Sequence, residues 1–372
     1  MNTHYYLNNK KYYSKRELIL ESEKKNLNWE ESSLVIEELP SNIQLTDEVD
    51  LYQKSQVIFK KIKDTKKKTA LLISGGIDSK FMLECFIRNN IAPDCIIIYT
   101  ADPFNGREPF SAYYIESKTA LDDIIEKKSN TPILEKTEII NIHVGEEEFY
   151  EFYVDTDWPL KNYALFGACG SPVHWASLPY LDKYLNNNDY LFLMGGATPV
   201  MWREDNQISV SFIDKQCQEI INGTCYGVDF TQYDRNFFNA YCSSIIKYAL
   251  KCNPNLVNVD FNKSLSFAES NKLKYIIPEI SELDKEVKSS LSKSFKKYFL
   301  EDNFLDDVNC SSFKNRLLYL QAIKDKPKWF DLYSNGVKKH EDWLKTIYYG
   351  PGTLTKPILT SEIPKEWEIS EY

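Results

Sequence analysis

A buried strand that leads through a double-glycine turn into a helix constrains the fold of this chain more than any other feature. Residues 69–73 form a short, continuous apolar run, which is typical of a strand buried on both faces. The apolar residues between 81 and 86 recur with helical spacing. Strand, turn and helix in this order predict a βα unit of a parallel sheet. The turn consists of Ser74, Gly75, Gly76, Ile77, Asp78 and Ser79.

Further apolar runs alternate with helical segments after this unit. Such alternation predicts an α/β fold, in which a parallel-stranded sheet carries helices on both faces. We expect this α/β domain to span residues 66–229. Its further strands are predicted at 95–99, 138–142 and 190–194, and its further helices at 111–127 and 172–185.

The segment before this domain is predicted to be a small α+β unit at residues 1–65. The pair Asn8-Asn9 suits a tight hairpin turn, a helix should follow Ser14, and 34–36 is apolar enough for a strand. A second helix should begin at Thr46 or Asp47. One face of that helix should be buried, and it consists of Leu51, Ile58, Phe59 and Ile62.

The segment after this domain, residues 230–372, is predicted to be a mainly helical C-terminal region. Its last part contains Gly350-Pro351-Gly352, Pro357 and Pro364, which favour an irregular tail. The helices are expected at 237–250, 264–273, 283–299, 313–323 and 337–347.

Composition narrows the class of function. The 372 residues include 45 Lys and Arg against 54 Asp and Glu, and this balance disfavours a protein that mainly binds nucleic acid. No apolar run reaches the roughly 18 residues of a membrane span, and the first residues do not resemble a secretory signal, so a cytoplasmic protein is expected. The eight cysteines contain no C-x-x-C pair, which favours free thiols over a zinc site.

The double-glycine turn has the features of a phosphate site. Gly75 and Gly76 let the backbone approach a ligand closely, and the turn presents N–H groups beside the positive end of a helix. The hydroxyls of Ser74 and Ser79 can add donors. Asp78 would repel a bare phosphate, so its presence predicts an intervening cation, most simply Mg²⁺. The alternative is a plain strand-to-helix turn in which Asp78 caps the helix.

The stretch LLISGGIDSKFMLECF, residues 71–86, resembles the PP-loop of the N-type ATP pyrophosphatases. This superfamily includes asparagine and β-lactam synthetases, which attach AMP to a substrate and release pyrophosphate. The resemblance implies a HUP-like α/β fold. It also implies that residues of the turn bind ATP. By position, Asp78 would ligate Mg²⁺, and Tyr99 and Thr100 would lie near the adenine. The turn residues that would hold ATP are Ser74, Gly75, Gly76, Ile77, Asp78 and Ser79.

A second strand that enters a glycine pair, at Gly195 and Gly196, resembles the loop of asparagine synthetases that supplies a second metal ligand and helps form the substrate pocket. The resemblance implies that both glycines are ATP-binding residues, and a plain structural turn is the alternative. That family has acidic residues where this chain has Thr198-Pro199, so the second metal ligand is open; Glu204, Asp205 and Asp102 are candidates. The sequence also shows no match to the N-terminal glutaminase domain of the asparagine synthetases. Nitrogen would therefore come from free ammonia, an amine substrate or a separate ammonia-supplying subunit.

Single residues add weaker signals. Lys356 follows a glycine-bearing loop, and the resemblance implies a late catalytic lysine that stabilises charge on the reacting phosphate; a solvated tail lysine is the alternative. Lys80 can face the phosphates or solvent. His143 and His174 are either acid–base groups or structural histidines. The lysine-rich stretch 60–68 is either a solvated face or an RNA contact.

The favoured function is ATP-dependent adenylation of a small-molecule carboxylate or amide, followed by displacement of AMP by a nitrogen nucleophile. Two alternatives remain open at this level. One is a non-catalytic protein that senses adenine nucleotides, and the other is a PP-loop enzyme that modifies tRNA or a nucleobase.

Overall fold

A computed structural model of the chain describes its secondary structure and packing over most of the first 250 residues and over a short part of the C-terminal segment. The described residues are 3–12, 15–36, 39–46, 50–73, 77–101, 118–160, 180, 189–195, 200–211, 218–221, 224–252, 335–336, 338–340, 342–343 and 357–368.

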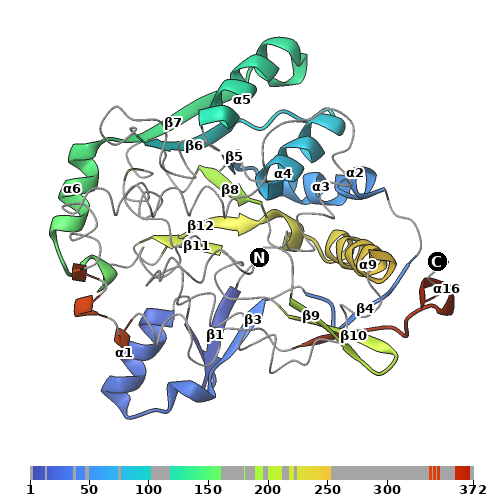
Figure 1. The fold of residues 1–372 in the computed structure, drawn as a ribbon, viewed down its shortest axis with the longest axis horizontal. Coiled ribbons are helices and arrows are strands. Elements are labelled where there is room, and N and C mark those ends of the chain that lie inside the picture. Colours follow the sequence, from blue (N-terminus) through green and yellow to red (C-terminus); the bar gives the residue numbers. More distant parts are fainter. Residues whose placement is uncertain are drawn as a thin grey trace.

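The largest sheet has six strands in the order β11-β12-β8-β5-β6-β7 (Figure 1). The five strands from β12 to β7 are parallel, and β11 pairs antiparallel with β12. The α/β class and all four predicted strands are confirmed, whereas β11 and β12 were not predicted. The strands are β5 (Lys68–Ile73), β6 (Cys95–Ala101), β7 (Glu138–Val144), β8 (Tyr190–Met194), β11 (Gln218–Ile221) and β12 (Thr224–Asp229).

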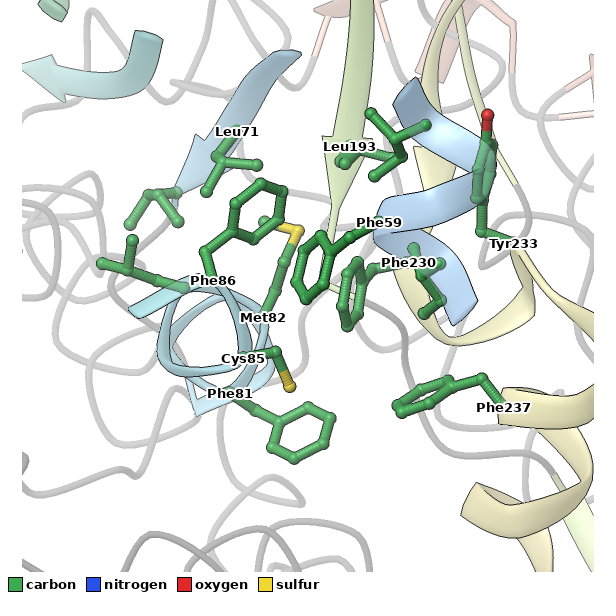
Figure 2. Close-up of a cluster of buried hydrophobic side chains, with 14 of the residues drawn as sticks. Phe59, Leu71, Phe81, Met82, Cys85, Phe86, Leu193, Phe230, Tyr233 and Phe237 are labelled. Carbon is green, nitrogen blue, oxygen red and sulfur yellow. The ribbon is translucent and has the colours of Figure 1, made fainter. Parts of the chain in front are cut away.

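Helices cover one face of this sheet. Leu71 of β5 and Ile96 and Ile98 of β6 lie in one buried cluster with side chains from these helices. Figure 2 shows Phe59, Phe86 and Phe230 meeting at its centre, and the Phe59 and Phe86 rings lie edge to face with their centroids 4.6 Å apart. The helices are α2 (Leu51–Lys54), α3 (Gln56–Asp64), α4 (Ile77–Arg88), α5 (Lys118–Asn130) and α9 (Arg235–Cys252).

The other face of the sheet is covered as well. Ala70, Ile97 and Ile142 alternate with the residues of the helical face, and each is fully buried. Burial on both faces explains why these strands read as continuous apolar runs in the sequence.

The N-terminal segment forms the predicted hairpin. Leu7 pairs with Lys10, and the two turn residues Asn8 and Asn9 have φ angles of 47° and 61°. Positive φ at both central positions gives a turn whose twist matches that of the strands, and asparagine tolerates this region well. The sheet has the order β2-β1-β3 and consists of β1 (Thr3–Leu7), β2 (Lys10–Tyr12) and β3 (Ser33–Ile36). Between β2 and β3 the chain forms α1 (Lys15–Lys25) and the short helix η1 (Trp29–Glu31).

The prediction of an irregular tail is wrong at 358–360. This segment is a strand whose neighbours come from distant parts of the chain, with β4 on one side and β10 on the other. Ser361 N donates to Ile43 O at 2.7 Å, and Ile363 N donates to Asn206 O at 2.8 Å. The four-stranded sheet consists of β4 (Asn42–Ile43), β9 (Val200–Glu204), β10 (Gln207–Ser211) and β13 (Ile358–Thr360), and α16 (Lys365–Glu368) follows it.

A second buried cluster draws on all three of the units expected from the sequence. Tyr5 and Leu18 belong to residues 1–65, Val210 to 66–229, and Phe238 and Trp367 to 230–372. The helix face Leu51–Ile62 of the first unit packs into the main cluster instead. The expected boundaries therefore do not separate the two cores, and the domain division itself stays a prediction.

Several helical expectations can be compared with the structure. The helix face at 51–62 is buried as predicted, but it is divided between α2 and α3. Helix α2 begins later than predicted, at Leu51, after the cap residue Asp50, whose side chain accepts from Tyr52 N and Gln53 N. The helix predicted at 237–250 is confirmed as α9, and the one at 111–127 corresponds in part to α5. Those at 172–185, 264–273, 283–299 and 313–323 lie outside the described residues, as does most of 337–347.

Two further observations complete the fold. Over 155–160 the chain leaves α6 (Glu146–Val154) for the short helix η5 (Trp158–Leu160), and Asp157 there pairs with Lys339 and His340, each at 2.7 Å. This contact ties a C-terminal segment to the α/β sheet region.

None of the helices in the described ranges is long and apolar enough to cross a membrane.

Candidate functional site

The candidate site lies at the carboxyl edge of the parallel sheet. The chain adds β6 and then β7 on one side of β5, and returns to place β8 on the other side (Figure 1). The order of the strands thus reverses between β5 and β8. In open α/β sheets, ligands bind beyond the carboxyl ends of the strands at such a switch point.

Both glycine pairs from the sequence analysis follow the two strands that flank this switch point. Gly75 and Gly76 come after β5, and Gly195 and Gly196 come after β8, whose last residue, Met194, pairs with Leu72. The sequence placed each pair at the end of a strand. Their position on adjacent strands is a result of the tertiary structure.

The structure describes the elements around the first glycine pair but not the turn itself. Ser74, Gly75 and Gly76 lie outside the described residues, and so do the side chains of Ile77 and Asp78, although both residues belong to α4. Because α4 begins at Ile77, its N-terminal N–H groups lie at the carboxyl edge. A helix N-terminus there favours anions.

The next two residues of α4 are buried. Ser79 is 3% exposed and Lys80 is 6% exposed, so of the two alternatives for Lys80 the solvent-facing one is wrong. One electrostatic partner of Lys80 is Asp123 on the neighbouring helix α5: burial raises the pKa of this carboxyl above its ordinary value, and the charge of Lys80 opposes that rise. A desolvated lysine ordinarily needs such a carboxylate partner.

Lys80 belongs to a row of charged side chains between α4 and α5. One turn further along α4, Glu84 accepts from Arg88 Nε at 2.8 Å. On α5, burial lowers the pKa of Lys127 to about 8, against the attraction of Glu84 and Asp123. Because the pKa of an unfolded lysine is near 10.5, the folded protein disfavours the charged form of Lys127.

We expect Lys127→Met to stabilise the protein at neutral pH by on the order of 1 kcal/mol, after discounting for solvent screening. Between about pH 8 and pH 10.5 the unfolded chain binds more protons at this site, so the free energy of unfolding of the wild type rises with pH in that window. The variant should lose that part of the rise. Urea denaturation across this pH range measures both effects, with Lys60→Met on exposed α3 surface as the control; equal slopes for all three proteins contradict the expectation.

Tyr99 and Thr100, predicted to lie near an adenine, are both buried at the carboxyl end of β6. As neighbours on a strand they point to opposite faces of the sheet. The Thr100 hydroxyl donates to Asn141 Oδ1 at 2.7 Å and lies 3.0 Å from His143 Nδ1, and both of these residues are on β7. The structure therefore brings His143 to the carboxyl edge, and it adds Asn141, which the sequence analysis missed because a single polar residue in a strand carries no motif.

The second metal ligand is not found among the described residues. No group of three or more metal-ligating side chains occurs within the ranges that the structure describes. Glu204 and Asp205, proposed as substitutes, lie at the turn of the β9–β10 hairpin in the four-stranded sheet, where Asp205 has a φ of 50°. Asp102 and Thr198-Pro199 lie outside the described residues.

One buried carboxylate at the same edge was not predicted. Asp229 ends β12 beside Met194, and it accepts from Thr231 N and Thr231 Oγ1, each at 2.7 Å, and from Gln232 Nε2 at 3.0 Å. These bonds cap the short helix η9 (Phe230–Gln232). With three donors on its two oxygens, this carboxylate serves the turn after β12.

The remaining sequence candidates are only partly placed. Lys356, Gly196 and His174 lie outside the described residues. In the lysine-rich stretch, Lys61 donates to Tyr233 O at 3.1 Å, and the ammonium groups of Lys61 and Lys68 lie over the rings of Tyr233 and Tyr190. Two of these lysines are therefore used in packing contacts.

The sheet topology defines the class of this protein: an α/β protein with a parallel sheet whose strand order reverses between β5 and β8. Comparison of the chain with models of known protein families finds no match, and comparison with curated proteins finds no significant similarity.

Proposed function

We propose that this protein is an ATP-dependent adenylating enzyme of the PP-loop class. It would activate a small-molecule carboxylate or amide as an acyl- or imidoyl-AMP, release pyrophosphate, and then let a nitrogen nucleophile displace AMP. The observation that carries the proposal is that both glycine pairs follow the strands on either side of the switch point in the sheet.

The donor set around the first glycine pair fits a triphosphate with a divalent cation. The N–H groups at the start of α4 would donate hydrogen bonds to the β- and γ-phosphates, and we expect those of the turn 74–76 to do the same. Asp78 supplies a carboxylate for Mg²⁺, which prefers oxygen ligands and phosphate oxygens. A Mg²⁺ ion held by Asp78 would supply positive charge beside the phosphate oxygens of the pyrophosphate.

The chain's own contribution would be positioning and charge stabilisation. The turn and α4 would hold the leaving pyrophosphate. Tyr99 and Thr100 lie near the carboxyl end of the neighbouring strand β6, where we expect the adenine. Lys356 would add a positive charge that acts on the reacting phosphate in the transition state. The nitrogen would come from ammonia, an amine substrate or a separate subunit.

A second candidate is a non-catalytic protein that binds adenine nucleotides as a signal. It is favoured by Thr198-Pro199, which stands where the resembling synthetases carry acidic residues. The same phosphate site would then hold ATP without cleaving it. A PP-loop enzyme that modifies tRNA or a nucleobase uses the same activation and is a third reading.

The test is AMP formation by the purified protein. With ATP, Mg²⁺ and a pool of cellular metabolites, we expect AMP and pyrophosphate to form in equal amounts, and mass spectrometry of the pool to show which compound is consumed. Binding of ATP with no cleavage in any pool supports the sensor instead. Binding of tRNA that weakens steeply with salt supports the nucleic-acid reading.

A further inference from the structure

The lysine-rich stretch is a surface that the proposed function does not use. Residues 54–68 contain seven lysines and one aspartate, Asp64, in a chain whose net charge is −9. The last part of the stretch, the turn from α3 into β5, lies at the amino edge of the sheet. The candidate phosphate site is at the other end of β5, about 20 Å away for a strand of six residues. A ligand of this surface would therefore be independent of the adenylating site.

Four of these lysines have ammonium groups without a partner. Their side chains are exposed, and among the residues that the structure describes their Nζ atoms make no ion pair or hydrogen bond. We call these four the lysine patch, and its members are Lys60, Lys63, Lys66 and Lys67. In contrast, the ammonium groups of Lys61 and Lys68 lie over tyrosine rings.

The end of α3 brings the lysine patch together. Lys60 and Lys63 are one helical turn apart, which corresponds to about 5 Å along the helix axis. After the cap residue Thr65, Lys66 has a φ of 57° and turns the chain out of the helix. Lys66 N donates to Lys63 O at 3.2 Å, and Lys67 N donates to Thr65 Oγ1 at 3.2 Å. The patch is therefore a compact group on a backbone fixed by hydrogen bonds.

The positive charge of the patch is not explained by the fold. Like charges one helical turn apart destabilise a helix. The helix dipole favours cations in the last turn, which accounts for Lys63 but not for Lys66 and Lys67, because these follow the helix. Dense positive charge without carboxylate partners is typical of surfaces that bind polyanions.

The residue types of the stretch favour a nucleic-acid backbone over a protein or a membrane. Protein interfaces are depleted in lysine and pair carboxylates with arginine, and residues 54–68 contain no arginine. A helix on a membrane surface exposes apolar side chains, whereas Ile58, Phe59 and Ile62 of α3 are buried. Lysine ammonium groups, in contrast, bind phosphates as point charges.

The surroundings of the patch favour double-helical RNA among nucleic acids. Single strands bind with their bases stacked on aromatic rings. Here Tyr233 is buried, and the Lys68 ammonium group lies over the Tyr190 ring, 5.6 Å from its centroid. Both rings are thus engaged by the protein itself. A-form RNA has a narrow major groove that brings the phosphates of its two strands together, whereas the major groove of B-form DNA is about 12 Å wide. A compact group of charges fits the narrower groove.

We propose that the lysine patch binds the phosphate backbone of double-helical RNA without reading its base sequence. Each ammonium group pairs with phosphate oxygens and releases counterions, so binding weakens as the salt concentration rises. Base edges are not read, because side chains do not reach them in the deep major groove of A-form RNA. The negative charge of the rest of the chain repels RNA and confines the contact to this patch.

The test is a titration of a fluorescent RNA duplex of about 20 base pairs with the full chain, followed by anisotropy between about 50 and 200 mM salt. For the wild type we expect the logarithm of the affinity to fall with the logarithm of the salt concentration with a slope of about −3 to −4. Replacing the whole patch should weaken binding roughly tenfold or more and bring the slope close to zero. This variant combines Lys60→Gln, Lys63→Gln, Lys66→Gln and Lys67→Gln.

The matched control removes four positive charges from exposed positions elsewhere. It combines Lys24→Gln, Lys136→Gln, Lys338→Gln and Lys365→Gln. It should bind the RNA duplex like the wild type, and thermal melting checks that both variants are folded. Equal losses in the two variants mean that only net charge matters, and this overturns the proposal. Absence of binding by the wild type overturns it too, and so does binding that survives in the patch variant.

Two further probes test the choice of partner. A DNA duplex of the same sequence and polyglutamate should both bind the wild type more weakly than the RNA duplex. Equal affinity for DNA overturns the assignment to A-form RNA, and tighter binding of polyglutamate indicates an acidic protein instead. The patch variant should still form AMP at the wild-type rate, so failure of the RNA contact and failure of the adenylating function are seen in different measurements.

Discussion

Asp78→Ala should abolish ATP-dependent release of pyrophosphate, by about 10²- to 10³-fold or more, while the protein stays folded. The carboxylate is the proposed ligand of Mg²⁺, and loss of one group that stabilises charge in a transition state costs about that much. Asp78 lies in the first turn of α4. Pyrophosphate and AMP are measured with the activating metabolite present.

The matched control for this variant is Asp64→Ala, which removes an exposed carboxylate at the end of α3. It should retain wild-type turnover. Thermal melting of all three proteins checks that each is folded. A folded Asp78→Ala protein with undiminished turnover contradicts the metal role, and loss of turnover in both variants shows that the effect is not specific to the turn.

Phe86→Ala should destabilise the protein by about 3–5 kcal/mol, the cost of removing a buried aromatic ring. Phe86 is 1% exposed, and its ring meets Phe59 edge to face and Phe230 at a centroid distance of 6.1 Å (Figure 2). These three rings join α3, α4 and η9. A cavity there weakens the attachment of three elements at once, and chemical denaturation with fluorescence detection measures the change in the free energy of unfolding.

The contrasting variant is Ile125→Ala on α5, whose side chain is 51% exposed. Its free energy of unfolding should change by no more than about 0.5 kcal/mol, as is usual for surface positions. A loss for Phe86→Ala as small as this one means that the cluster relaxes to fill the space, and then the packing in Figure 2 is not what holds α4 on the sheet.

The strands of the parallel sheet were predictable where burial on both faces produces a continuous run of apolar residues in the sequence. Residues 69–73 and 95–99 are apolar without interruption, and each is a strand in the structure. The hairpin at Asn8-Asn9 was predictable because two residues with positive φ require a particular turn chemistry. In each case the signal lies within a few consecutive residues.

The strands that were missed lack such a local signal. The three residues of β13 pair with β4 and β10, which lie about 315 and 150 residues earlier in the chain, respectively, and burial there comes from those partners. Strand β12 contains Gly227 and ends in a buried aspartate, Asp229, which looks like a turn residue in sequence. Its carboxylate is buried because the turn after it supplies the donors.

By itself, the sequence determined that a buried strand, a double-glycine turn and a helix follow one another, because apolar period and turn chemistry are properties of neighbouring residues. Only the tertiary structure decided that β8 lies next to β5, that the C-terminal strand joins β4, and that Asn141 and His143 meet Thr100. These pairings depend on which distant segments bury each other's apolar surfaces. The free energy of that burial depends on both segments, so it cannot be predicted from the sequence of either one alone.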